Sequence, residues 1–435
     1  MKRTSAGSII PVDESPAEQM ADVVRHPELA GITRSNEISA PHGQSVPCNG
    51  LHKAGAGAEI RAWPDSVESM RRFPVNDAER AILDGSAWAD FCDRLKAIGP
   101  LVLGDQVPRD ALTAAEGYRY LSRLLRGGLE AFLEYGDPLF PQLRCPAHET
   151  LKLGADNPDN RYESCAIDAA HDYRISGTRG TVDYLGFGAV INRYASGGGM
   201  ETTGYIDARD MQIGPDGRFE LIVSQREHPG NWLRMGPATN SINVRQTFQD
   251  RRSERPAELR IERIGAAGEY PQPLDAAQLM RALQGAVGFV HGSAVMFENW
   301  AESFLPTLNR LPPADQEYCR RIGGDPNIFY FHGAWRLAPD EMLVITAPRI
   351  PQCQSWNFQL SNWWMESLDY RYHRIHVNKH TARYEPDGSV RIHVAHRDPG
   401  LPNWIDTAGH GTGTMCWRWI GAGEHPLLDA EVRRI

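Results

Sequence analysis

The 435-residue sequence lacks the features that mark several large protein classes. No apolar run approaches the ~18 residues that a membrane-spanning helix needs. Gly-x-Gly-x-x-Gly, P-loop and Gly-x-Ser-x-Gly motifs are also missing, which argues against dehydrogenase, kinase and esterase functions. With a net charge of −9, the chain has no basic excess to neutralise phosphates. We therefore expect neither a membrane nor nucleic acid as a partner, and no nucleotide cofactor.

Cysteine is scarce and irregularly spaced. The seven cysteines include no Cys-x-x-Cys pair, and their odd number fits neither a disulfide framework nor a structural zinc site. The basic start at Met1 is not followed by the apolar segment of a signal peptide. These features predict reduced thiols and a cytoplasmic protein.

The chain contains the same unit twice. Five short anchors recur in the same order, at offsets between about 162 and about 172 residues. Residues 112–116 match 274–278, 154–158 match 323–326, 215–217 match 386–388, 231–232 match 403–404, and 262–264 match 433–435. A period this long indicates duplicated domains, so we expect 112–264 to superpose on 274–435. Asn231 and Asn403 should be equivalent, with the tryptophan after each packed under its sheet.

Helical and alternating patterns follow one another within each repeat. Capping boxes at Thr113-x-x-Glu116 and Asp275-x-x-Gln278 predict a helix at the start of each. Strand-like alternation then follows in both copies, at Phe219, Leu221 and Val223 and at Val390, Ile392 and Val394. The predicted fold class is α+β, mainly β: two tandem repeats of helix plus antiparallel sheet, packed as β-sandwiches. Residues 1–70 are predicted to form a disordered or loosely attached arm and 71–111 a helical lead-in.

The candidate catalytic residues lie where the second repeat gains polar groups. Strand parity from Val390 sends His396 and Asp398 inward just beyond the apolar run, and Asp406 and His410 follow within about a dozen residues. The corresponding stretch of the first copy has no equivalent histidines. We expect an acid–base pair formed by His396 or His410 with Asp398 or Asp406. A hydrogen-bonded polar hairpin is the alternative.

Of the two candidate histidines, His396 and His410, the more specific prediction concerns His396. It should face a cleft and lie within hydrogen-bond reach of a carboxylate, with Asp398, Asp406 and Asp156 as candidates. A closed pocket containing His396 or His410 would favour an enzyme, whereas an open aromatic groove would favour a binding protein.

Other residues are candidates for binding substrate or metal. The substrate-binding candidates are Arg161, Tyr162, Trp363, Arg397, Asn403 and Trp404, with Trp363 expected to be exposed. The loop at 154–162 could hold calcium through Asp156 and Asp159, or could be a structural turn. Strand parity places His373 and His376 on opposite faces, so no metal is assigned to the histidines of the second repeat.

Several segments resemble a known family. The Pro-Asp-Asn-Arg-Tyr loop at 158–162, the Asn-Trp pairs at 231 and 403, and Trp356-Asn357-Phe358 with Arg397-Asp398-Pro399 are similar to bacterial proteins that carry domain of unknown function 1214. The resemblance extends from residue 110 to the end and is most specific between 340 and 420. It implies a β-sandwich-like fold and supplies no catalytic residue.

The sequence leaves two functions open. The first is a catabolic enzyme that acts on a small hydroxyl- or carbonyl-bearing substrate by His/Asp acid–base chemistry. The second is a non-catalytic carbohydrate-binding β-sandwich protein, in which aromatic side chains stack on sugar rings. A homo-oligomer is possible in either case.

Deleting residues 1–60 should leave the melting temperature nearly unchanged, because this segment offers almost no periodic apolar face to pack on a core. Thermal unfolding of the truncated and full-length chains measures the effect. A loss of several degrees would contradict the prediction of a loosely attached arm.

Overall fold

The computed structural model describes residues 75–435, so the arm predicted for residues 1–70 lies outside the described residues. The helical elements are α1 (Val75–Leu83), α2 (Ser86–Ile98), η2 (Gly99–Leu103), α3 (Ala111–Leu129), η3 (Glu130–Glu134), η4 (Tyr194–Ser196), η5 (Ala208–Asp210), α4 (Ala276–Glu302), η6 (Leu305–Thr307) and α5 (Gln316–Arg321). The strands of the first repeat are β1 (Asn160–Ala166), β2 (Tyr173–Thr178), β3 (Tyr184–Asn192), β4 (Met200–Asp207), β5 (Arg218–Ser224), β6 (Trp232–Arg234), β7 (Ser241–Thr247) and β8 (Glu258–Arg263). Those of the second are β9 (Ile328–Arg336), β10 (Glu341–Ala347), β11 (Ser355–Ser361), β12 (His376–Asn378), β13 (Val390–Ala395), β14 (Trp404–Asp406), β15 (Thr412–Ile420) and β16 (Asp429–Arg434).

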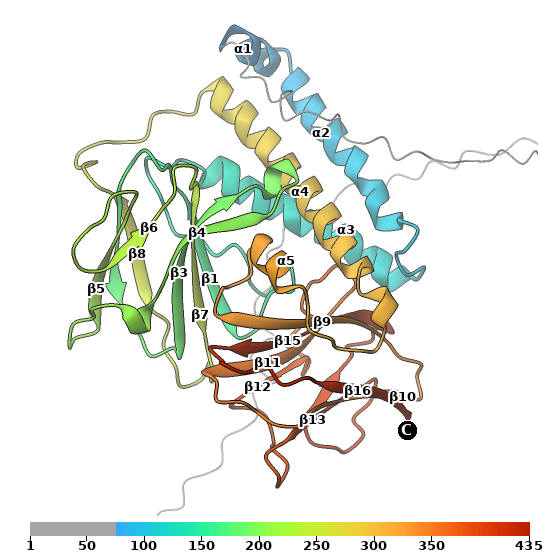
Figure 1. The fold of residues 1–435 in the computed structure, drawn as a ribbon. Coiled ribbons are helices and arrows are strands. Elements are labelled where there is room, and N and C mark those ends of the chain that lie inside the picture. The colour runs from blue at the N-terminus through green and yellow to red at the C-terminus, as the bar shows by residue number, and fades with distance from the viewer. Residues whose placement is uncertain (1–74) are drawn as a thin grey trace, which may run out of the picture. The chain divides into compact units, whose positions relative to one another are not determined.

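The two repeats have the same strand order. Each contains two four-stranded sheets: β1-β7-β3-β4 with β6-β5-β2-β8 in the first, and β9-β15-β11-β12 with β14-β13-β10-β16 in the second (Figure 1). The parallel pair β5·β6 recurs as β13·β14, and the other strand pairs of the four sheets are antiparallel. The predicted fold class is therefore confirmed. The limits 71–111, 112–264 and 274–435 stay predictions.

Asn231 and Asn403 make the same contacts in the two repeats. The side-chain amide of Asn231 donates to the carbonyls of Gln212 and Glu220 at 2.8 and 2.9 Å. Asn403 donates to two carbonyls of the second repeat, at 2.7 and 2.9 Å. Asn231 thus links the loop before β5 to β5, and Asn403 links the loop before β13 to β13. Both asparagines therefore have a structural role.

The tryptophans that follow these asparagines lie on the outer side of their sheets. The indoles of Trp232 and Trp404 each donate a hydrogen bond of 3.1 Å to the neighbouring strand. Trp404 is half-buried and packs on Met342, Val344 and Ala395, which form a small cluster separate from the sandwich core. The prediction that these residues pack under their sheets is therefore wrong for Trp404, because β14 is an edge strand whose apolar core position is Ile405.

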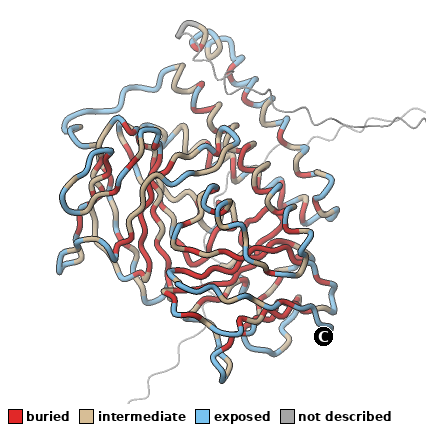
Figure 2. Tube along the Cα trace, viewed as in Figure 1, coloured by how far each residue is buried: buried red, intermediate tan, exposed pale blue. Residues whose placement is uncertain are grey.

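Each sandwich has its own core, and the alternating residues predicted to face inward are buried. The first core contains Phe187, Leu221 and Val244, and the second is centred on Trp356 and Trp417, whose rings stack at 4.6 Å. Figure 2 shows the buried segments concentrated along the strands of both repeats. At about 1.5–3 kcal/mol for each large apolar side chain removed from water, burial in the two cores dominates the stability of the fold.

The long helix of each repeat packs against the other repeat. Helix α4 runs against η4 of the first repeat, where Gly288 and Gly292 allow close approach: a Cβ on Gly292 would lie 2.0 Å from the carbonyl oxygen of Tyr194. Helix α3 instead contacts the segment after β11 in the second repeat, whose Trp364 donates to the carbonyl of Thr113 at 3.0 Å. This exchange of helices ties the two sandwiches together.

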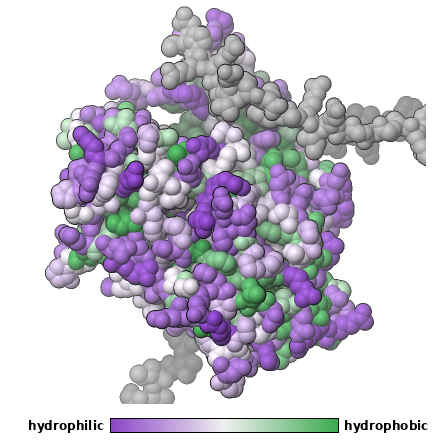
Figure 3. Space-filling view, viewed as in Figure 1, coloured by the Kyte–Doolittle hydropathy of each residue, from purple (hydrophilic) through white to green (hydrophobic). Residues whose placement is uncertain are grey.

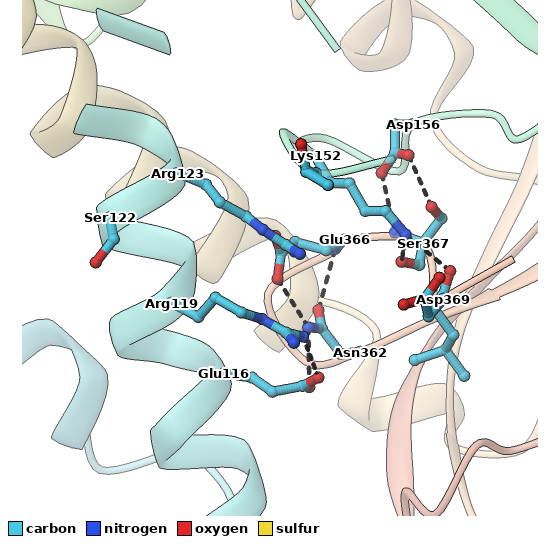
Figure 4. A network of polar contacts seen from close by, with 12 residues as sticks. Glu116, Arg119, Ser122, Arg123, Lys152, Asp156, Asn362, Glu366, Ser367 and Asp369 are labelled. Atoms are coloured by element: carbon cyan, nitrogen blue, oxygen red, sulfur yellow. Dashed lines mark hydrogen bonds and ion pairs between the residues drawn. The ribbon is translucent and has the colours of Figure 1, made fainter. Parts of the chain in front are cut away.

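A buried polar network secures α3 to the second repeat (Figure 4). Arg123 reaches from the helix to Glu366 at 2.6 Å, and Asn362 donates to Glu116 at 3.0 Å. Glu116 also lies 2.8 Å from Nε2 of His410, and all but Arg123 are largely buried. A buried carboxylate needs such partners, since an unpaired one would cost several kcal/mol.

The helix starts agree only in part with the predicted capping boxes. Asp275 and Gln278 form the predicted box at the start of α4. Helix α3 begins earlier than predicted, because Asp110 is its N-cap and accepts from the backbone of Thr113 at 2.9 Å. Glu116 is therefore free of a capping role and is turned to the second repeat.

The surface of the described residues is mixed. On the face shown in Figure 3, hydrophilic residues predominate and hydrophobic ones occur in scattered patches. None of the helices described between residues 75 and 435 is long and apolar enough to cross a membrane.

The Glu116–His410 pair should make stability depend on pH. Burial acts to lower the pKa of His410, but the hydrogen bond and charge of Glu116 outweigh it and raise that pKa above 6.5. Burial likewise acts to raise the pKa of Glu116, and His410 outweighs it and lowers that pKa below 4.5. The pair therefore stabilises the fold most between these values, and its histidine contribution is lost as the pH rises through the raised pKa of His410.

We expect His410→Gln to lower the free energy of unfolding by about 2 kcal/mol near pH 6, with the difference from the wild type shrinking above pH 6.5. Urea unfolding of both proteins from pH 5 to 9 measures this. His373→Gln, at an exposed histidine beside Asp406, is the matched control and should have a smaller effect. A difference that does not vary with pH would contradict the interpretation.

Candidate functional site

A cavity of about 180 Å³ lies between the two sandwiches. One wall comes from β1 and β7 of the first repeat, and the opposite wall from β9 and β15 of the second. Helix α4 contributes Phe289, Phe297 and Trp300. The cavity is therefore built from the faces of two sheets that point away from their own cores.

Internal duplication gives the cavity two equivalent arginines. In the first repeat Tyr162 on β1 lies opposite Arg245 on β7, and in the second Tyr330 on β9 lies opposite Arg418 on β15. All four residues line the cavity. Their common register positions show that the duplicated strands carry one arginine and one tyrosine from each repeat to the same space.

Each arginine reaches across to the loop of the other repeat. Arg418 donates to the carbonyl of Ala155, and Arg245 donates to the carbonyl of Gly323. Both carbonyls precede β1 or β9 by the same number of residues, so the contacts are reciprocal. Ala155 and Gly323 both have positive φ, 57° and 97°, which turns their carbonyls toward the partner repeat.

The two loops are equivalent but differ in charge. Tyr162 Oη accepts from the backbone N–H of Asn157 and Tyr330 Oη accepts from that of Asp325, each at 2.9 Å. Asn157 and Asp325 also accept from the backbone two residues ahead, at 3.0 and 2.9 Å. Asn157 is thus the counterpart of Asp325, whereas the alignment of the two sequence repeats had paired Asp156 with Asp325.

This difference leaves Arg418 without a directly paired carboxylate. Burial acts to lower the pKa of Arg418, but nearby groups, the buried Asp156 among them, outweigh it and raise that pKa. Arg245 lies 3.5 Å from the carboxylate of Asp325, which outweighs burial and raises the pKa of Arg245 above its usual range. Arg418 is 4 % exposed and bonds only to neutral oxygens, of Gln359 at 2.7 Å, Asn357 at 3.4 Å and Ala155. Among residues 75–435, no carboxylate lies within ion-pair distance of Arg418.

The pKa values of His332 and Cys319 in the cavity wall are shifted away from neutral pH. Burial lowers the pKa of His332 to about 3, and Arg418 adds to the effect, so the imidazole is neutral. Its Nδ1 has no partner among the described residues. Burial raises the pKa of Cys319 to about 12 and that of Tyr162 above its usual value. The cavity therefore offers hydrogen-bond donors and acceptors, together with the buried carboxyl group of Asp156, whose pKa is raised by burial.

His396 does not form the predicted pair. It lies just past the end of β13, with Nδ1 2.9 Å from Thr407 Oγ1 and Nε2 3.2 Å from the carbonyl of Leu337. None of the described carboxylates reaches it, and it does not line the cavity between the sandwiches. The prediction of a cleft-facing histidine beside a carboxylate is wrong, because the strand ends at Ala395 and a threonine takes the expected place.

The carboxylates proposed for His396 are engaged elsewhere. Asp398 is exposed and caps a turn by accepting from Gly400 N at 2.8 Å, and Arg397 beside it is exposed. Asp156 accepts from Ser367, through the backbone at 2.9 Å and the hydroxyl at 2.7 Å. Local turns and contacts between repeats thus satisfy these groups.

His410 and Asp406 do form histidine–carboxylate pairs, but with unexpected partners. His410 is buried against Glu116 of α3, and Asp406 lies 2.7 Å from Nδ1 of His373. Neither His410 nor Asp406 lines the cavity. Their catalytic role stays a prediction that the position of the cavity does not favour.

Of the predicted binding residues, Tyr162 lines the cavity and the others do not. Arg161 pairs with Glu163 at 3.0 Å, and Asn403 bonds to the backbone of its own repeat. Trp363 was expected to be exposed, and this is wrong: it is 1 % exposed, because β11 ends at Ser361 and its alternation does not continue to residue 363.

The loop at 154–162 is a contact between repeats. The oxygens of Asp159 accept from Asn378 at 3.0 Å and Asn357 at 3.2 Å, and His376 lies 3.2 Å away. Within the described part of the chain, no group of three or more His, Cys, Asp or Glu residues could hold a metal ion. The structural turn is therefore favoured over calcium at Asp156 and Asp159.

The sequence did not single out Arg245, Arg418, Tyr330 or His332. One usable signal was present, because Arg418 is a charged residue between Trp417 and Trp419, in a strand whose positions from 413 to 420 are all buried. An alignment shifted by one residue in the loops would have paired Tyr162 with Tyr330 and revealed the matching arginines.

Asp325→Asn should strongly destabilise the protein. Asp325 is completely buried, accepts from Tyr184 at 2.7 Å and balances the charge of Arg245. Removing one member of a buried ion pair typically costs about 3–5 kcal/mol, which we expect as the loss in free energy of unfolding in urea. Asp216→Asn, at an exposed carboxylate, is the control. A loss below about 1 kcal/mol would show that this pair does not hold the repeats together.

Comparison with known proteins agrees with this architecture. A crystal structure of an uncharacterised protein from Burkholderia cenocepacia is 50% identical, with a TM-score of 0.80, over 82% of this chain and 98% of that one. A Vibrio parahaemolyticus protein is 11% identical over 73% of this chain and 98% of its own, and its TM-score of 0.44 supports no further argument. No curated protein matches the chain. Residues 337–424 match the model described as protein of unknown function (DUF1214), and the chain belongs to that family.

Proposed function

We propose that this protein binds a small organic anion in the cavity between its two sandwiches, with Arg418 holding the anionic group. The observation that carries the proposal is the buried guanidinium of Arg418, which bonds only to neutral oxygens. A buried charge is costly unless it is paired. A ligand carboxylate would supply the charge that Asp325 supplies to Arg245.

Two tyrosines add donors for the same group. The hydroxyls of Tyr162 and Tyr330 each accept a backbone N–H, and no described residue accepts their own protons. Burial raises both pKa values above the usual range, so the hydroxyls stay protonated and can donate to a carboxylate. The anion would thus meet a guanidinium and two phenols.

The size and walls of the cavity define the rest of the ligand. A cavity of about 150 Å³ is large enough for one benzene ring, and this one is about 180 Å³. The aromatic side chains of Phe289, Phe297 and Trp300 provide an apolar surface. We infer a ligand with one ring or a short chain.

Binding is favoured over acid–base catalysis as the role of this cavity, because His332 is a weak base and the thiol of Cys319 remains protonated near neutral pH. The catabolic His/Asp enzyme and the carbohydrate-binding protein remain competing predictions. A cytoplasmic location also remains part of the proposal.

Asn157→Asp tests the proposal by building the missing countercharge into the protein. Asn157 is the counterpart of Asp325 and accepts from Asn357 at 2.6 Å, next to Arg418. We expect wild-type protein to bind benzoate or hexanoate in calorimetric titrations, and Asn157→Asp to bind at least about tenfold more weakly.

Neutral ligands and a matched variant control this experiment. Benzamide and hexanamide should bind more weakly than the acids, and Asn299→Asp, at an exposed site on α4, should bind as the wild type does. Equal binding of acids and amides, or an unchanged affinity in Asn157→Asp, would contradict the proposal. Binding of monosaccharides without binding of acids would favour the carbohydrate alternative.

A further inference from the structure

Arg144 is a second cation of the cavity wall without a directly paired carboxylate; burial lowers its pKa, and the nearby charge of Glu130 offsets this only in part. Its backbone is fixed by two hydrogen bonds of 2.9 Å with Ser164 on β1. The side chain lines the cavity. Among residues 75–435, no carboxylate pairs with it and no side-chain hydrogen bond involves it. It is held in place by its backbone while its guanidinium remains available.

The acidic residues of the same wall are already satisfied. Asp156 accepts two hydrogen bonds from Ser367, and Glu163 accepts from Arg161 at 3.0 Å and Gln246 at 2.7 Å. Since Arg245 is balanced by Asp325, two guanidinium groups without a directly paired carboxylate remain, at Arg144 and Arg418.

These two groups come from opposite walls. Arg144 is attached to β1 of the first repeat, whereas Arg418 projects from β15 of the second. We propose that the ligand carries two anionic groups, as a short α,ω-dicarboxylate does, with one carboxylate at Arg418 and the other at Arg144. This inference rests on the proposed function, and it adds the second charge and the residue that recognises it.

A second pocket outside the cavity supports an anionic ligand. Arg144, Ser164 and Asn192 line both spaces, so the two share a wall. This second pocket also contains Arg281 and Arg193, the latter paired with Glu201 at 3.3 Å, and none of its described lining residues is acidic. In a chain with a net charge of −9, this local positive potential would draw a dianion toward Arg144.

The test compares dicarboxylates of four to eight carbons with monocarboxylates of the same lengths, by calorimetric titration of the full-length chain. The best dicarboxylate should bind wild-type protein about tenfold to a hundredfold more tightly than its monocarboxylate, the range for one added charged hydrogen-bonded contact. In Arg144→Gln this preference should disappear, so that the dicarboxylate and its monocarboxylate bind about equally, while the affinity for the monocarboxylate stays unchanged.

Two further variants separate recognition from folding. Arg144→Lys keeps the charge but not the fork of donors, so it should retain part of the preference for dicarboxylates. Arg234→Gln, at an exposed arginine away from the cavity, should retain all of it. If Arg144→Gln does not fold, loss of the preference in a folded Arg144→Lys supports the inference and full retention overturns it.

The outcomes distinguish the two proposals. Equal binding of the two acid series by wild-type protein, or an equal loss for both series in Arg144→Gln, would overturn the dianion while leaving the anion site in place. Binding of neither series would overturn the anion site as well.

Discussion

The reciprocal contact between Arg245 and Arg418 and the loops of the opposite repeat is the constraint on which the rest of the structure depends. Each guanidinium crosses to a backbone carbonyl, at Gly323 or Ala155, and so fixes the distance between two sheets that have separate cores. The exchange of α3 and α4 between repeats acts in the same direction.

Duplication explains how one binding space acquires both symmetry and specificity. The scaffold positions are shared: Tyr162 with Tyr330, and Arg245 with Arg418. The chemistry differs where the copies diverge, because Asn157 replaces the carboxylate of Asp325. If both copies carried the carboxylate, each of the two arginines would have its own ion pair. Neither guanidinium would then be left unpaired for an anion to neutralise. The loss of one countercharge converts a structural ion pair into a site that a ligand can complete.

The sequence predicted the architecture well and the site poorly, for physical reasons. Alternation at Phe219–Val223 and Val390–Val394 marked strands correctly, since burial on one face leaves a period of two in the sequence. Equivalence of Asn231 and Asn403 followed from the same repeat. The site depends on contacts across the repeats, and no local period records which strand faces which. His396 was misplaced because strand parity was extended beyond Ala395, where the strand ends.

The position of the site follows from how the repeats share their helices. Helix α4 presents Phe297 to the cavity and also reaches the loop of the first repeat, where a Cβ on Gly154 would lie 2.6 Å from that ring. A side chain at residue 154 would therefore push the helix away from both sandwiches. Because α4 begins the second repeat yet packs on the first, an anion that bridges the two walls stabilises the same interface that the arginines hold. Binding and the association of the repeats are thus thermodynamically linked, and the ligand contributes to the stability of the fold in proportion to how well it occupies the site.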